Sequence, residues 1–240
     1  MSIRAQLTSL EQQFQSSRNL SVKKGLVVAL ILGAILSALV SIIIETATGV
    51  ANTAIGAALL QPFIEQIFKG LSIVIVAWFI WKIIPNRRYG AVLGAATGLG
   101  FSITEVIFFA GGPASIFAAR FIAEPTMHPM WDAFVGIGIF VLMAQKSSRE
   151  KTPSWLGWLF IIFGLLAHII WNSLSVVLAI NVFASLIIEW IVVFVPFALI
   201  LRDFLGGHYN FQDFLKPMTE MTAATTMPVA NQFPPPPPPP

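Results

Sequence analysis

The chain has 240 residues and a mass of 26.2 kDa, of which 56% are hydrophobic and only 10% are charged. Soluble domains usually carry about 25% charged residues. A mean hydropathy of +0.81 leaves too little polar surface to cover a water-soluble globule, so the composition excludes a soluble enzyme and indicates a largely lipid solvent. The absence of Cys also excludes a disulfide scaffold and a cysteine-ligated metal site.

Six apolar stretches are long enough to cross a bilayer, since roughly 20 helical residues at about 1.5 Å each cover its hydrocarbon core. The first stretch begins behind two lysines, as a signal peptide does, but it exceeds the usual apolar length of about 7–15 residues and therefore indicates an uncleaved anchor. The sequence predicts an all-α, polytopic membrane helix bundle. Its expected spans are residues 25–44, 62–84, 91–110, 127–144, 155–180 and 182–201.

The basic residues predict the orientation of these spans. Of the 14 Lys and Arg residues, all except Lys69 and Arg120 precede the first span or close or follow the second, fourth and sixth, so they lie on one side. The excess of basic residues in cytoplasmic loops then places both termini in the cytoplasm. The net charge of +3 is thus explained by membrane topology, and no nucleic-acid partner is expected. We expect a multi-pass protein of the plasma membrane.

The two ends of the chain lie outside the predicted bundle of residues 25–201. Residues 1–24 form a cytoplasmic amphipathic segment, which either lies on the inner membrane surface or pairs with another helix. Residues 202–216 form a second such segment. Residues 217–240 are a disordered tail that ends in Pro234–Pro240. This polyproline end either binds a cytoplasmic proline-binding partner or remains unengaged.

Polar residues inside the spans carry the functional signal, because an ionisable group there costs at least about 2.5–3.5 kcal/mol on insertion scales. In four spans these residues recur three and four positions apart, so each helix presents one polar face. We predict that the four faces meet in the bundle interior, with the Glu and His residues at one depth in the outer third of the membrane. The four sets are Glu65, Lys69 and Ser72; Gly94, Gly98, Ser102 and Glu105; His128, Asp132 and Gly136; and Gly164, His168, Asn172 and Ser175.

Carboxylates and imidazoles at one depth can activate water by general base catalysis, directly or through a divalent metal. We predict that Glu65 with His128 activates water and that Glu105 positions the histidine or the metal. His168 and Asn172 are expected to stabilise the developing oxyanion. These roles fit hydrolysis of a peptide bond near the membrane surface.

Three further residues are expected to support this chemistry. Lys69, one turn from Glu65, keeps that carboxylate ionised, and Asp132 shares a face with His128. Arg120, in the joint before the fourth span, steadies Glu124 or a substrate carboxyl group. A divalent metal such as zinc would have as its candidate ligands Glu105, His128 and His168.

Each signal also has a simpler explanation. Glu65 and Lys69 are spaced as an intrahelical ion pair, His168 and Asn172 as interhelical hydrogen-bonding residues, and His128 suits the headgroup level. An ion-coupled transporter also uses intramembrane Glu, His and Lys, but the two halves of the chain share no evident repeat. A catalytically silent membrane scaffold is the remaining alternative.

The order of the motifs resembles the PrsW family of intramembrane proteases, distant relatives of the CAAX prenyl protease and bacteriocin-processing enzymes. That family shows Glu-Glu-x-x-Lys, Gly-x-Gly-Phe-x-x-x-Glu, an Arg with a His followed by Gly, and His-x-x-x-Asn or Asp. The corresponding segments here are Glu65 to Lys69, Gly98 to Glu105, Arg120 through His128 to Gly136, and His168 to Asn172.

The resemblance implies an endopeptidase that cuts single-span or membrane-tethered proteins close to their extracytoplasmic side, in some members as the first cut of a signalling cascade. The resemblance leaves open whether the water is activated by zinc or by a metal-free Glu–His pair. One position departs from the pattern, because Gln66 replaces the second Glu. If the family chemistry needs both carboxylates, the chain is inactive or altered. We expect activity to survive because Glu65, Glu105 and both histidines remain.

Overall fold

The computed structural model describes residues 23–80, 87–110, 114–146 and 153–174, together with 184, 187–188, 190–195 and 198. Within these residues the structure is helical, which confirms the predicted all-α class. Half of the sixth predicted span lies outside the described residues, as do residues 1–22, residues 202–216 and the tail with Pro234–Pro240. Five described helices are long and apolar enough to cross a membrane, namely Lys23–Thr48, Gly56–Phe79, Arg88–Phe108, Phe121–Met143 and Ser154–Asn172.

The first two helices form a hairpin. The first passes through a widened π-type segment, η1 (Gly33–Leu39), into α2 (Val40–Thr48), and ends where Gly49 adopts a left-handed φ of 65°. A short turn, η2 (Val50–Asn52), follows, and Oγ1 of Thr53 then accepts a hydrogen bond from the Gly56 amide at 3.0 Å. A second widened segment, η3 (Gly56–Leu60), leads into α3 (Gln61–Ile80). The stretch after the first span therefore reverses the chain.

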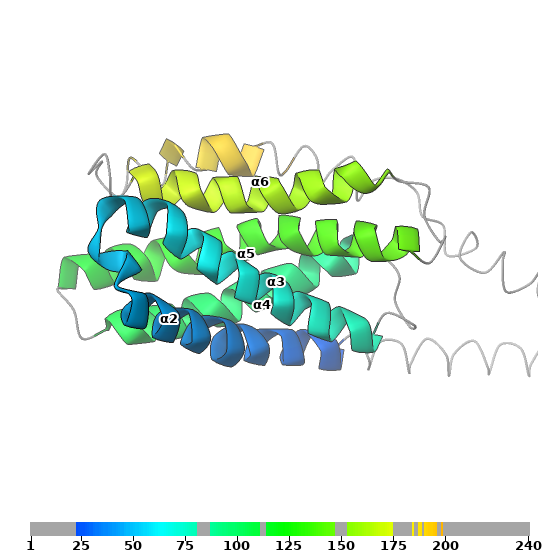
Figure 1. The fold of residues 1–240 in the computed structure, drawn as a ribbon, viewed down its shortest axis with the longest axis horizontal. Coiled ribbons are helices and arrows are strands. Elements are labelled where there is room, and N and C mark those ends of the chain that lie inside the picture. The colour runs from blue at the N-terminus through cyan, green and yellow to red at the C-terminus, as the bar shows by residue number, and fades with distance from the viewer. Residues whose placement is uncertain are drawn as a thin grey trace, which may run out of the picture. The chain divides into compact units, whose positions relative to one another are not determined.

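The remaining long helices are α4 (Arg87–Phe109), α5 (Ala114–Lys146) and α6 (Ser154–Asn172). In Figure 1 they run side by side, and α5 packs against both α4 and α6. The fourth predicted span began at residue 127, whereas α5 begins at Ala114, so Arg120 lies in a helix and not in a joint. Pro125 and Pro129 lie inside α5 without ending it, since packing neighbours can satisfy the carbonyls that a proline frees.

Glycines bring α4 and α5 into close contact. A Cβ atom at Gly98 would lie 2.5 Å from the backbone oxygen of His128 and 2.6 Å from Oδ2 of Asp132. Gly90 and Gly136 meet in the same way, backbone against backbone, further along the pair. Small residues allow membrane helices to approach this closely, and the approach brings the polar faces of α4 and α5 together.

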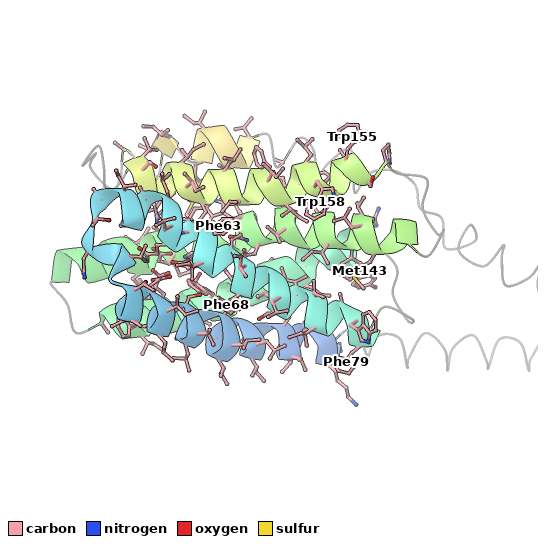
Figure 2. The ribbon with its side chains drawn as sticks, viewed as in Figure 1. Phe63, Phe68, Phe79, Met143, Trp155 and Trp158 are labelled. Carbon is pink, nitrogen blue, oxygen red and sulfur yellow. The ribbon has the colours of Figure 1, made fainter. Side chains whose placement is uncertain are left out.

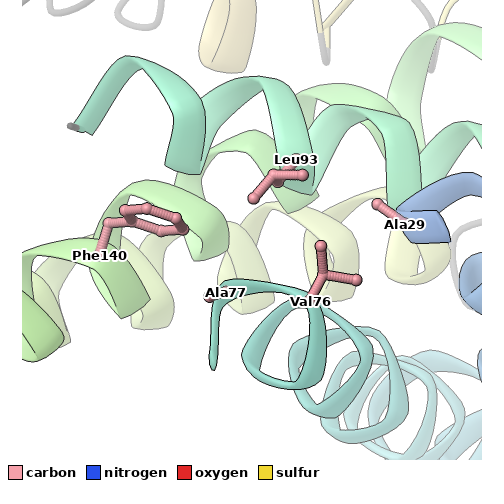
Figure 3. Close-up of a cluster of buried hydrophobic side chains, with 5 residues drawn as sticks. All are labelled: Ala29, Val76, Ala77, Leu93 and Phe140. Carbon is pink, nitrogen blue, oxygen red and sulfur yellow. The ribbon is translucent and has the colours of Figure 1, made fainter. Parts of the chain in front are cut away.

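The bundle separates a buried core from an apolar outer surface. Figure 3 shows a buried cluster contributed by the first helix, α3, α4 and α5, formed by Ala29, Val76, Ala77, Leu93 and Phe140. Large apolar side chains such as Phe79, Trp155 and Trp158 are exposed on the outside of the helices (Figure 2). An outside of this kind is compatible with lipid, which confirms an integral membrane protein.

Candidate active site

The polar faces of four helices meet inside the bundle, as the residue spacing predicted. Glu65 and Lys69 of α3, Glu105 of α4, His128 of α5 and His168 of α6 are each at most 5% exposed. Nε2 of His128 lies 3.0 Å from Oε2 of Glu105, and Nε2 of His168 lies 3.6 Å from Oε2 of Glu65. Four residues far apart in the sequence therefore form one buried site.

His128 lies at the centre of this site. Its Nε2 atom is 2.6 Å from Oε2 of Glu124, in addition to its contact with Glu105. On the other side of the ring, Nδ1 is hydrogen-bonded to Nζ of Lys69 at 2.8 Å. The ring also packs at 4.8 Å, centroid to centroid, against Phe101. Contacts on both nitrogens and on the ring fix the orientation of this imidazole.

Lys69 is fully buried and connects two helices. Its Nζ atom lies 3.6 Å from Oε2 of Glu65 on the same helix and 3.8 Å from Oδ2 of Asp132 on α5. It also lies 4.4 Å from the centre of the Phe101 ring, a cation–π contact. Lys69 is thus more than the partner of Glu65 in an intrahelical pair.

His168 is held by an aromatic neighbour. Its ring stacks on Trp131 of α5, with centroids 4.3 Å apart and planes 16° apart, and meets the His128 ring edge-on at 4.9 Å. One turn before Glu65 on α3, Nε2 of Gln61 donates a hydrogen bond to Oε1 of Glu65 at 3.2 Å. Both members of the Glu65–His168 contact are therefore positioned by further residues.

Two of the predicted residues are placed differently from the expectation. Nδ2 of Asn172 donates a hydrogen bond to the backbone oxygen of Ala57 at 2.9 Å, which joins α6 to η3. The amide expected to face an oxyanion is therefore engaged with the backbone. The Arg120 backbone lies in α5, but its side chain is outside the described part of the chain, and so is its expected contact with Glu124.

The interior also contains buried polar residues that the sequence analysis did not assign to the site. Glu124 was expected only to meet Arg120, yet it contacts His128 one turn further along α5, and the Glu-x-x-x-His spacing was the available signal. The first helix was read as apolar throughout. It buries Ser37, Ser41 and Glu45, which share a face at intervals of four, and Oγ of Ser37 lies 2.8 Å from Oγ of Ser72.

Two groups of side chains in the described residues are arranged so that they can hold a metal ion. Within each group the donor atoms lie within 4.8 Å of one another. Histidine and carboxylate donors of this kind suit zinc. His128 belongs to both groups, whereas the predicted trio is divided between them. The groups are Glu65, His128 and His168, and Glu105, Glu124 and His128.

The charge of the interior supports a cation as well. The described side chains around His128 include four carboxylates and one lysine, a formal charge of −3 before any proton is taken up. Buried charge of one sign is costly unless it is paired or coordinates a metal. A divalent cation would remove most of this imbalance. The side chains concerned are Glu65, Glu105, Glu124, Asp132 and Lys69.

A bundle of membrane-spanning helices whose interior brings imidazoles and carboxylates together in groups that can hold a metal ion has the architecture expected of a polytopic membrane metalloenzyme. A sequence model described as "PrsW family intramembrane metalloprotease" matches residues 22–201, which is 180 of the 240 residues. The chain belongs to the PrsW family of intramembrane metalloproteases. The predicted class of enzyme, an intramembrane protease, is thereby confirmed. No curated protein and no solved structure matches the chain.

Proposed function

We propose that this protein hydrolyses peptide bonds of membrane-anchored proteins near the extracytoplasmic face of the plasma membrane, with zinc and a Glu/His site activating the water. The convergence of two carboxylates on Nε2 of His128, with Glu65 and His168 beside them, carries the proposal. The outer-third depth follows from counting residues along the spans and from the distribution of Lys and Arg.

We assign the metal to Glu105, Glu124 and His128. The two carboxylate oxygens lie 3.0 and 2.6 Å from Nε2, so three donor atoms converge tightly, and their two negative charges balance a divalent cation. The Lys69 ammonium lies 3.6 Å from Glu65 and donates to Nδ1 on the other side of the ring, so zinc at Nε2 would displace the ring proton and leave an imidazolate paired with this cation. A metal at the other group would share Glu65 with this cationic side chain. When bound, zinc supplies Lewis-acid polarisation of water and of the substrate carbonyl.

Glu65 is then available as the general base. Its Oε2 atom is buried and accepts no hydrogen bond from any side chain or backbone group that the structure describes, so a lone pair remains for the proton of a water. The water oxygen bonds to the carbonyl carbon as Glu65 takes this proton. The C–N bond then breaks, and the proton passes to the leaving nitrogen, which yields a carboxylate and an amine. His168, 3.6 Å from Glu65, stabilises the negative charge on the former carbonyl oxygen.

The first experiment measures two quantities: the zinc bound to the purified protein and the new protein N-termini that appear in the membranes. Wild type and the isosteric variants Glu65→Gln and Glu124→Gln are expressed at equal levels, and new protein N-termini in the membranes are compared. The purified proteins are also analysed for bound zinc. We expect Glu65→Gln to keep its bound zinc but to produce new N-termini at least about 100-fold more slowly, because general base catalysis contributes at least about this factor to the rate. We expect Glu124→Gln to lose both.

The alternatives predict other results. If Glu65→Gln loses zinc and Glu124→Gln keeps it, the metal belongs to Glu65, His128 and His168, and the assignment above is wrong. Termini that are identical in all three membranes, with all proteins folded, would contradict proteolysis. Stable complexes with uncut partners would then indicate a scaffold, and proton-coupled flux in proteoliposomes a carrier.

A further inference from the structure

Gln66 is buried on α3, close to two residues of the site. Glu65 contacts His168, and Lys69 contacts His128. Gln66 is 6% exposed, and its Nε2 atom donates a hydrogen bond to Oδ1 of Asp132 at 2.5 Å, across the interface between α3 and α5. The other carboxylate oxygen of Asp132, Oδ2, lies 3.8 Å from Nζ of Lys69. One carboxylate therefore joins two side chains of α3.

An amide nitrogen at position 66 supplies the donor that an ionised Asp132 needs. Asp132 is fully buried, so an oxygen of residue 66 facing Oδ1 would place two acceptors in contact with no solvent to separate them. A glutamate at this position would also bring a second negative charge against Asp132. The amide oxygen of Gln66 is buried and accepts no hydrogen bond from the described groups, so the contact with Asp132 is the polar contact that positions this side chain.

The space for Asp132 is provided by a glycine. A Cβ atom at Gly98 would lie 2.6 Å from Oδ2 of Asp132, so a larger residue on α4 would displace this carboxylate. Gln66 holds Oδ1 of Asp132, and the space at Gly98 accommodates Oδ2, which faces Lys69. Lys69 in turn is hydrogen-bonded to Nδ1 of His128 at 2.8 Å.

We propose that Gln66 is a positioning residue for the metal site, acting through Asp132 and Lys69 to orient the His128 ring so that Nε2 faces Glu105 and Glu124. This inference rests on the metal assignment made above. The amide at position 66 would then have a function, because a carboxylate there would break the contacts from residue 66 through Asp132 and Lys69 to His128. Residues that orient metal ligands from outside the ligand set typically contribute about 10- to 100-fold to metal affinity.

The test uses Zn²⁺ as the probe and needs no substrate. The full-length protein is purified in detergent, stripped of metal, and titrated with Zn²⁺ against a chelator of known affinity. Gln66→Met keeps the volume but removes the donor, and Gln66→Glu replaces the donor with a charge. We expect both to weaken zinc binding by at least about tenfold. The double variant Gln66→Glu/Asp132→Asn reverses donor and acceptor while keeping the total charge, and we expect it to bind within about threefold of wild type, because coupled residues compensate one another.

The matched control is Ser72→Ala, on the same helix as Gln66, which removes a buried hydrogen bond to Ser37 of the first helix. It should leave zinc affinity unchanged even if it lowers the unfolding temperature. Unchanged zinc binding by Gln66→Met, or tighter binding by Gln66→Glu, would overturn the inference. If Gln66→Met does not accumulate as folded protein, the double variant decides, and a loss of more than about tenfold there would overturn the inference.

The design separates this inference from the proposed function. Glu124→Gln serves as the reference for the metal assignment, since it removes a proposed ligand. If Glu124→Gln binds zinc as wild type does, the assignment itself is wrong. If Glu124→Gln loses zinc while the Gln66 variants bind normally, only the positioning role of Gln66 is wrong.

Discussion

Replacing Lys69 with Met removes the ammonium group that lies between two buried carboxylates. Nζ of Lys69 is 3.6 Å from Glu65 and 3.8 Å from Asp132, and the side chain is fully buried, so water cannot take its place. Removal of one partner from a buried ion pair typically costs about 3–5 kcal/mol, because the remaining charge is left without compensation. At about 1.4 kcal/mol for each factor of ten, the unfolding equilibrium should shift by about 100- to 5,000-fold.

The assay is unfolding in mixed micelles by titration with SDS, followed by tryptophan fluorescence. Trp131, one of seven tryptophans, stacks on His168 inside the site, so part of the emission reports on the region that loses the charge. The matched control is Lys24→Met, the same substitution at an exposed position at the start of the first helix. We expect the control to unfold at the SDS fraction of wild type and Lys69→Met at a clearly lower one.

A double variant tests the stated cause of the loss. In Lys69→Met/Asp132→Asn one of the two uncompensated carboxylates is also removed, so part of the lost stability should return. Equal unfolding of Lys69→Met and Lys24→Met would refute the reasoning, since it would mean that Lys69 does not compensate these carboxylates. A double variant less stable than Lys69→Met alone would show that packing, and not charge, causes the loss.

Two further predictions concern the packing that supports the site. Gly98→Ala should lower both stability and zinc affinity, because its Cβ would overlap Asp132, whereas Gly70→Ala meets only Val135, at 3.9 Å, and should gain up to about 1 kcal/mol of helix propensity; equal unfolding of the two variants would contradict this. Ser37→Ala should cost at least about 0.5–1.5 kcal/mol in the same SDS assay, because it removes the bond to Ser72 and the bond that Ser37 donates to the Phe68 oxygen at 3.1 Å. Adding Ser72→Ala should cost little more, since the bond between the two hydroxyl groups is already lost. Fully additive losses would show that the two hydroxyl groups act independently.

Much of the site was predictable because a helix repeats every 3.6 residues whatever surrounds it. Glu65 and Lys69 share a face of any helix, as do His128 and Asp132, and ionisable groups in a membrane span are too costly to face lipid. That the polar faces of four spans meet therefore followed from spacing and composition, and burial of these residues confirms it. Glu124 lay within reach of the same reasoning, one turn from His128.

Other features depended on contacts between segments that are distant in the sequence. Nothing in the local sequence pairs Asn172 with the backbone of Ala57, 115 residues away, since that contact requires η3 to lie beside the end of α6. The partner of Gln66 was equally inaccessible. Its amide bonds Asp132 because α3 and α5 lie side by side there and because Gly98 leaves room for the carboxylate.

The membrane bundle, the polar faces and the residue types expected of a hydrolytic site could be predicted from composition and helical periodicity, because both act locally. The packing of the helices against one another places two carboxylates at Nε2 of His128 and Lys69 on the other side of the ring. These distances are set by how closely backbones pack at residues such as Gly98, and a helical repeat carries no information about the partner helix.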